Sequence, residues 1–508
     1  MTFARCLRYF AVLILLVFAT QGLRAQVKAP HLEEAKSRTA AAPRVAPASM
    51  LLFGAIPVST HSREARKFVE LALDKYEGVM VADAVVLAKH ATEKDPDFAL
   101  GYAVLSFASR KAIPNSAALA RAKALLPHAT PDERLLVRWM TSVQERDLLP
   151  AIASMNDLLK RYPNDKHVLY LTSTWLYSQQ DYERSQKMME ALLIQDPNFS
   201  PVLNMLGYAY MEVGHPDPSK AVATLKRYAE LEPSSPNPED SMGEVLRYIG
   251  DDDASLEHYG AALQIEPTFF SSQLGLGDTL TLKGAYEGAR LEYDKAMRVA
   301  SNQRDFLHAS HQKALIYFWE GRPDEGKNAL AEIARKAAGK EEPNELFEAR
   351  LSSAMLSANY SSELQQLLAL EQALQNNDNG MTGADRGSAL AIVLCEEARI
   401  ASLHEQRDVV ESAISRLARS AAQSGDLRVT NNYDKARGFL LLSQNDLFGA
   451  ADALTADKRS PLAVQQLAIA QEKLGDKAAA EETRAQLRYQ RAPTVEWFLA
   501  SHAGGIAH

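Results

Sequence analysis

Glycine and proline recur at a nearly constant interval through the middle of the chain. Gly207, Gly243 and Gly277 follow one another after 36 and 34 residues. A second series, spaced by 34, 36 and 34 residues, consists of Pro163, Pro197, Pro233 and Pro267. A period in this range is typical of solenoids, in which short helical hairpins stack on one another. The period therefore predicts one long all-α array for this chain of 508 residues, rather than several globular domains.

Residues 200–235 show how one hairpin is built. Apolar and small residues recur at helical spacing in each half of this unit. The first face holds Leu203, Leu206, Gly207 and Tyr210, and the second holds Ala221, Leu225 and Tyr228. Helices approach closely only where side chains are small, so we expect Gly207 and Gly243 at helix crossings. The turn glycines, expected in the left-handed conformation, are Gly214, Gly250 and Gly284.

These units resemble the tetratricopeptide repeat (TPR) family at its signature positions. The small eighth residue is Gly207, Gly243 or Gly277, and the large eleventh residue is Tyr210, Leu246 or Leu280. The twentieth position holds Ala221, Ser255 or Ala289, and the closing proline is Pro233 or Pro267, with Ser301 in the third unit. The resemblance implies a right-handed superhelical solenoid of stacked antiparallel helical hairpins. Clear repeats on this template cover residues 65–98, 132–165, 166–199, 200–235, 236–269, 270–303 and 307–340.

The repeat period drifts after Pro343. We interpret residues 51–342 as the TPR-like solenoid, 343–492 as degenerate TPR-like hairpins and 493–508 as a C-terminal tail. The drifting region is either a cap or a second binding module. Before the clear repeats, Ser62 is expected to cap a helix that runs through Tyr76. Ile113-Pro114-Asn115 is expected to form a loop, because proline interrupts helices.

The N-terminus has the features of a bacterial export signal. Arg5 and Arg8 precede an apolar run from Tyr9 to Ala19, which is shorter than the roughly 20 residues of a spanning helix. We interpret residues 1–25 as a signal peptide, with an uncleaved anchor as the alternative. Residues 26–50, rich in Ala and Pro, are interpreted as a flexible linker. The mature protein is then expected in the periplasm or outside the cell, without stable membrane insertion.

Charge and cysteine content restrict the partners and the stabilising forces. The net charge of -8 provides no basic field for phosphates, so nucleic-acid binding is disfavoured. The two cysteines are Cys6, inside the expected signal, and Cys395. Without the signal no internal disulfide can form, and the stacking of hairpins must stabilise the fold.

The motifs that suggest chemistry have simpler explanations in the repeat. Gly321 to Asn328 has the spacing of a phosphate-binding loop, but Asn328 replaces the Ser or Thr that binds magnesium, and no strand is expected before it. His308 and His311 lie one helical turn apart without a third ligand nearby, which is typical of surface histidines. Cys395 lies in an apolar run and is expected to be buried. We therefore predict no enzyme activity, no cofactor and no metal site.

The remaining candidate for function is the concave groove. In the resembled family, the first helix of each repeat lines this groove. Carried over to this sequence, the partner-binding residues are Tyr170, Thr174, Tyr177, Asn204, Tyr208, Met211, Asp240, Glu244, Arg247, Tyr248, Asp278, His311 and Phe318. Tyrosines among carboxylates suit a protein or peptide partner, because aromatic rings supply contact area and carboxylates select charge. The alternatives are an envelope component that binds a solute or glycan, and an enzyme whose groups come from distant repeats.

Overall fold

Short helices make up nearly all of the chain that the structure describes. The structure is a computed structural model. It describes residues 50–109, 112–212, 216–378, 380–424, 426–457 and 459–504. The predicted signal peptide, the linker up to residue 49 and the turn glycine Gly214 lie outside these ranges.

The first half of the array contains helices of 10 to 15 residues. They are α2 (Arg63–Glu77), α3 (Val81–Lys94), α4 (Ala99–Ala108), α5 (Ala112–Leu125), α6 (Pro131–Glu145), α7 (Leu148–Arg161), α8 (Lys166–Ser178), α9 (Tyr182–Gln195), α10 (Ser200–Glu212), α11 (Pro218–Leu231), α12 (Asn237–Ile249), α13 (Asp252–Ile265), α14 (Phe270–Leu282) and α15 (Tyr286–Val299). A single 3-10 turn, Leu126–His128, follows α5.

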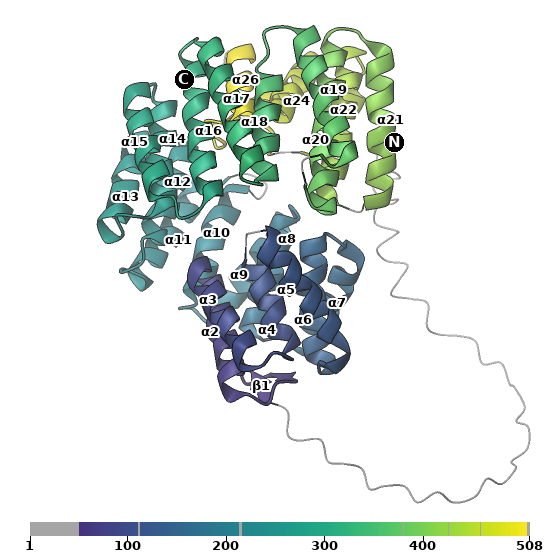
Figure 1. Cartoon of the computed structure of the whole chain (residues 1–508). Helices are drawn as coiled ribbons and strands as arrows, with labels where there is room; N and C mark the ends of the chain where they lie inside the picture. The colour runs from purple at the N-terminus through teal and green to yellow at the C-terminus, as the bar shows by residue number, and fades with distance from the viewer. Residues whose placement is uncertain are drawn as a thin grey trace, which may run out of the picture. The chain divides into compact units, whose positions relative to one another are not determined.

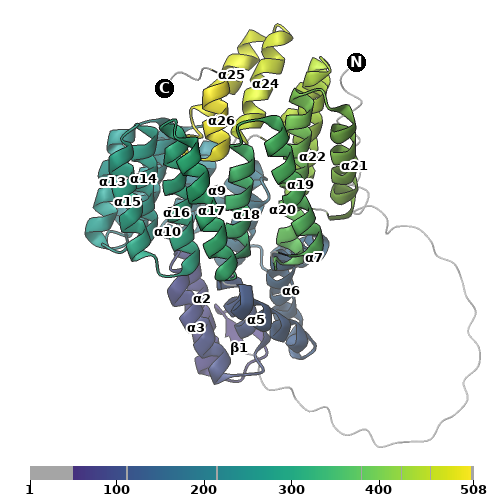
Figure 2. The same ribbon diagram turned by 45° about the horizontal axis from the view of Figure 1, so that its top comes forward.

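Several helices of the second half are longer, up to 21 residues. They are α16 (Gln303–Trp319), α17 (Pro323–Gly339), α18 (Pro343–Met355), α19 (Tyr360–Asn376), α20 (Gly383–Leu403), α21 (Arg407–Ser424), α22 (Leu427–Ser443), α23 (Leu447–Leu454), α24 (Pro461–Lys473), α25 (Lys477–Leu487) and α26 (Val495–Gly504). Consecutive helices lie side by side as hairpins, and each hairpin packs on the next (Figure 1 and Figure 2). The fold is therefore an all-α, TPR-like solenoid, as predicted.

The apolar core is divided into clusters between neighbouring hairpins. One cluster runs from Leu52 to Trp175, and smaller ones follow along α8 to α15. The largest cluster extends from Leu307 to Ala500. Cys395 is fully buried within it, as predicted. Among the helices that the structure describes, none combines the length and apolar character needed to cross a membrane.

A small β-hairpin precedes the first helix. Strands β1 (Met50–Leu52) and β2 (Ile56–Val58) pair antiparallel, with Leu52 opposite Ile56. Leu52, Ile56 and Val58 are buried in the N-terminal cluster. The predicted solenoid begins at residue 51, but these two strands were not predicted. The Ser62 hydroxyl accepts a hydrogen bond from the Ala65 amide at 3.1 Å, which confirms the predicted cap of α2.

Glycines allow the helices of the middle hairpins to approach closely. A Cβ atom on Gly207 would lie 2.7 Å from Leu225 Cγ, and one on Gly243 would lie 2.9 Å from the Tyr259 ring. Such distances are sterically forbidden, so the prediction that these glycines lie at helix crossings is confirmed. The turn residues Gly250 and Gly284 have φ angles of 87° and 75°, which confirms their left-handed conformation.

Two local predictions are wrong. Ile113-Pro114-Asn115 lies in the first turn of α5, not in a loop. A proline is accepted there because the first amides of a helix have no partner within the helix. The expected C-terminal tail contains α26, in which Trp497 is 6% exposed and packs against Val464 and Leu487.

Candidate functional site

The predicted groove residues all lie on first helices of hairpins, namely α8, α10, α12, α14 and α16. None of them is fully exposed. The buried members are Tyr170, Asn204, Met211, Asp240, Arg247, Asp278 and Phe318, and the half-buried members are Thr174, Tyr177, Tyr208, Glu244, Tyr248 and His311. A ligand could reach the half-buried side chains more readily than the buried ones.

A ladder of hydrogen bonds joins five of these residues across α10, α12 and α14. The hydroxyls of Tyr208 and Tyr248 donate to the two oxygens of Glu244, at 2.8 Å and 2.5 Å. Arg247 donates to Asp278 at 2.8 Å. The carboxylates that were predicted to select a charged ligand are thus already paired with neighbouring repeats. Such buried polar networks fix the relative position of the helices that carry them.

Two further predicted groove residues pair with serines on the first helix of the next hairpin. Ser241 donates to Asn204 at 2.7 Å, and Ser272 donates to Asp240 at 2.6 Å. Burial raises the pKa of Asp240 to about 7, and the charge of Glu244 acts in the same direction. Hydrogen bonding from Ser272 and the charge of Arg247 oppose this change without cancelling it.

The remaining predicted residues are not part of this ladder. The Tyr170 hydroxyl donates to the backbone carbonyl of Glu77 at 3.2 Å, and Thr174 donates within its own helix. His311 Nε2 lies 2.8 Å from the Ser352 hydroxyl, and burial lowers the pKa of this imidazole to about 4. Met211 and Phe318 belong to apolar clusters. The structure therefore gives these five residues packing or bonding partners within the fold.

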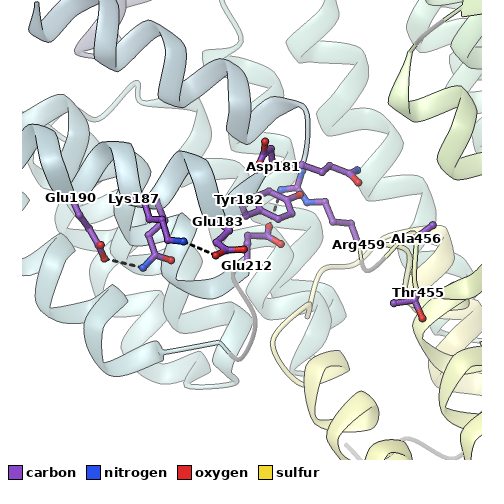
Figure 3. Close-up of a pocket in the computed structure, with 11 residues that line it drawn as sticks. Asp181, Tyr182, Glu183, Lys187, Glu190, Glu212, Thr455, Ala456 and Arg459 are labelled. Atoms are coloured by element: carbon purple, nitrogen blue, oxygen red, sulfur yellow. Dashed lines mark hydrogen bonds and ion pairs between the residues drawn. The ribbon is translucent and has the colours of Figure 1, made fainter. Parts of the chain in front are cut away.

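An open cleft of about 780 Å³ lies beside the ends of α8, α9 and α10 (Figure 3). One wall comes from α9 and the residues before it, and Glu212 at the end of α10 contributes to it. The facing wall is the loop after α23. The lining residues are Gln180, Asp181, Tyr182, Glu183, Gln186, Lys187, Glu190, Glu212, Thr455, Ala456 and Arg459. The cleft is thus built from two regions far apart in the sequence.

Acidic side chains outnumber basic ones in this lining. Lys187 Nζ lies 2.6 Å from Glu183, and both side chains are about 70% exposed. Gln186 donates to Glu190 at 2.8 Å, on the same helix face. The exposed Lys187–Glu183 pair is accessible to solvent, so a ligand could replace it at little cost, whereas the Gln186–Glu190 bond is half-buried.

Arg459 reaches across the cleft to the opposite wall (Figure 3). Its guanidinium carbon lies 5.5 Å from the ring centre of Tyr177 and 5.4 Å from that of Tyr182. The same group donates to Glu212 at 2.9 Å. Burial lowers the pKa of Arg459, but the charge of Glu212, the two tyrosines and the hydrogen bond to Glu212 together outweigh burial and raise the pKa. We call Tyr177, Tyr182 and Glu212 the tyrosine cage.

Of the residues at the cleft, only Tyr177 was among the predicted groove residues. The predicted groove residues lie on first helices, whereas Tyr182, Glu183 and Lys187 belong to α9, the second helix of its hairpin. The charged residues of α9, among them Glu183 and Lys187, were a signal in the sequence that this second helix presents polar side chains to solvent. No signal within one sequence could pair Arg459 with Glu212, since 247 residues separate them.

One group among the described residues has a geometry that a metal ion could use. The ligand atoms of Asp74, Glu77 and His167 lie within 4.8 Å of one another. His167 Nδ1 lies 2.8 Å from a Glu77 carboxylate oxygen, and its ring stacks on Phe53. Burial raises the pKa of Glu77. Burial lowers that of His167, but the hydrogen bond to Glu77 and the charges of nearby carboxylates together outweigh burial and raise the His167 pKa. The two side chains satisfy each other as a buried pair.

Comparisons with known proteins give only distant structural likeness. No family model and no curated protein matches this sequence. The chain is similar to yeast Tom70 at 15% identity and a TM-score of 0.41, over 84% of this chain and 96% of that one. It is similar to a tetratricopeptide repeat protein from Parabacteroides merdae at 14% identity and a TM-score of 0.35, over 54% and 93%. YrrB, a TPR protein with an unusual peptide-binding site, is similar at 20% identity and a TM-score of 0.26, over 44% and 96%.

Proposed function

We propose that this chain is a non-catalytic scaffold that binds a segment of a partner protein in the cleft beside α8, α9 and α10. The cleft itself carries this proposal. Its volume of about 780 Å³ is in the range of specific ligand sites, and its walls present an aromatic ring among carboxylates. Among the predicted groove residues, we assign a role in binding to Tyr177, which adjoins the cleft. The other twelve remain predictions.

The pairing of the lining side chains favours recognition over catalysis. The hydroxyl of Thr455 donates to the backbone carbonyl of Ala451, not to a general base. Glu183 pairs with Lys187 of its own helix and is exposed, and the half-buried Glu190 accepts hydrogen bonds from Gln186 and from the Tyr210 hydroxyl of α10. An acidic wall also repels phosphates, which supports a protein partner over nucleic acid.

Site-specific photocrosslinking tests the proposal. A benzoylphenylalanine placed at Lys187, inside the cleft, is expected to capture one discrete partner protein in the cells that make this chain. Substituting Glu183→Lys and Glu190→Lys should reduce the yield about tenfold, because the charge of the wall is reversed. The readout is the crosslinked band and its identification by mass spectrometry.

The matched control uses an exposed ion pair of the same spacing on α21. Arg407 and Glu411 are 2.7 Å apart and largely exposed, as Lys187 and Glu183 are. A crosslinker at Arg407 should capture no discrete protein, and Glu411→Lys should leave the capture at Lys187 unchanged. Equal capture from both positions, or none from the cleft, would contradict the scaffold function.

We also propose that the chain is an exported bacterial protein that acts in the periplasm or outside the cell. Arg5 and Arg8 followed by the apolar run from Tyr9 to Ala19 support this proposal. N-terminal sequencing of the protein recovered from the cell envelope should begin at Gln26. A chain that retains residues 1–25 and stays in the cytosol would contradict export.

A further inference from the structure

We propose that the tyrosine cage is a binding subsite for an arginine side chain of the partner, and that Arg459 occupies this subsite as an internal placeholder. The inference rests on the proposed function and specifies the partner's chemistry. It starts from the fact that a guanidinium group is already bound there.

The cage has the geometry that a guanidinium group requires. The rings of Tyr177 and Tyr182 are 5.1 Å apart at 68°, so they form two walls at a steep angle. Cations bind over aromatic faces within about 6 Å, and arginine does so more often than lysine. Glu212 closes the third side, with 24% of its side chain exposed. Two aromatic faces and one carboxylate together recognise both the shape and the charge of arginine.

The cage also holds an unused polar group. Among the described residues, the Tyr182 hydroxyl has no hydrogen-bond partner although the atom is buried. Buried polar atoms in folded proteins nearly always have a partner. A peptide passing through the cleft could supply one from its backbone, which Arg459 does not do.

Arg459 is held loosely enough to be displaced. Its side chain is 43% exposed, and it lies on the short loop between α23 and α24. The loop is fixed by other contacts: Asp457 lies 3.7 Å from Lys435, and the Ser460 hydroxyl donates to Glu496 at 2.6 Å. The Arg459 side chain can therefore leave the cage while the loop keeps its place.

The charge of the cleft favours an incoming cation once Arg459 leaves. Among the lining residues that the structure describes, four carboxylates, from Asp181, Glu183, Glu190 and Glu212, then face one ammonium group, that of Lys187. Such a surface attracts a basic segment and holds it after encounter. Because the same cage cannot hold two guanidinium groups, the partner's arginine competes directly with Arg459.

A direct binding measurement tests the competition. The probe is a short fluorescein-labelled peptide, Gly-Ser-Arg-Ser-Gly, and its matched control carries citrulline, which keeps the shape of arginine without the charge. We expect the Arg459→Ala variant to bind the arginine peptide about tenfold more tightly than the parent does. The reason is that this substitution removes a competing side chain that is half-exposed and makes two cation–π contacts. Adding Glu212→Gln to that variant should abolish the gain.

Two controls keep the result interpretable. Arg437 lies 5.5 Å from the ring centre of Tyr433 and pairs with Asp434, and none of these three residues lines the cleft, so Arg437→Ala should leave peptide affinity unchanged. Arg459→Gln, which keeps most of the side-chain stem, replaces Arg459→Ala if the latter loses helical circular dichroism. No gain in affinity, or an equal gain for the citrulline peptide, would overturn the proposal.

The outcomes also separate this inference from the scaffold function. If crosslinking at Lys187 captures no partner but Arg459→Ala gains affinity for the arginine peptide, the subsite stands and the scaffold function is wrong. If a partner is captured but peptide affinity does not change, the scaffold function stands and the placeholder role of Arg459 is wrong.

Discussion

Two buried aspartates among the predicted groove residues differ in how their charge is compensated. Asp278 accepts hydrogen bonds from Arg247 and Tyr293, both at 2.8 Å. Asp240 accepts one from Ser272, and its nearest compensating charge is the more distant guanidinium of Arg247. Burial raises the pKa of both carboxyls, and that of Asp240 reaches about 7. Asp240 is therefore a group whose ionisation near neutral pH opposes folding.

The substitution Asp240→Asn should make stability less dependent on pH. The folded-state pKa of Asp240 lies above its unfolded value of about 4. The stability that the protonated carboxyl contributes is therefore present in full below pH 4 and is lost as pH rises through about 7. The asparagine variant does not titrate. Its free energy of unfolding relative to the parent should therefore rise between pH 4 and pH 8, by at most about 4 kcal/mol. Urea unfolding at the two pH values measures this difference.

A second variant isolates the carboxyl group. Ser272→Ala removes the hydrogen bond to Asp240 but keeps the carboxyl, so the decline of stability with pH should persist. If Asp240→Asn declines with pH as steeply as the parent does, Asp240 is not the group responsible.

At the scale of one hairpin, helix contact depends on glycine. Gly207→Leu places a side chain where Leu225 already lies, because even a Cβ atom would be 2.7 Å from Leu225 Cγ. We expect a loss of about 1–3 kcal/mol and a lower thermal midpoint, as for other overpacked cores. Gly260→Leu on α13 is the matched control, since no atom lies within 4 Å of a Cβ built there. Equal melting of both variants would show that α10 and α11 are not held together at Gly207.

The sequence predicted elements best where the repeat was regular. Between Ser200 and Val299, each repeat contains one hairpin, as predicted. The spacing of glycine, alanine and apolar residues predicts it because these residues pack within the same hairpin. The wrong predictions concern segments whose local sequence is compatible with two different structures. Pro114 is compatible with a loop or a first helical turn, and α26 depends on a distant surface that buries Trp497. Neither result could be derived from neighbouring residues alone.

At the scale of the described array, contacts also link hairpins far apart in the chain. Arg146 pairs with Asp385 at 2.5 Å, and Arg491 binds Asp252 with two hydrogen bonds of 2.9 Å and 3.0 Å. A solenoid template predicts contacts only between adjacent repeats. The cleft depends on another such distant contact, between Arg459 and Glu212, which explains why the groove prediction recovered Tyr177 but not its arginine partner. The repeat period predicts which hairpins are adjacent, but it does not predict which side chains meet across about 240 residues of sequence.

The 247 residues between Glu212 and Arg459 also set an order in time. A ribosome adds roughly 5–20 residues per second, so α10 leaves it about 12–50 s before the loop that carries Arg459. During that interval the acidic wall and the two tyrosines exist without their internal cation. During synthesis, the wall formed by α9 and Glu212 is therefore available to arginine side chains of other molecules before Arg459 and the facing wall of the cleft have been made.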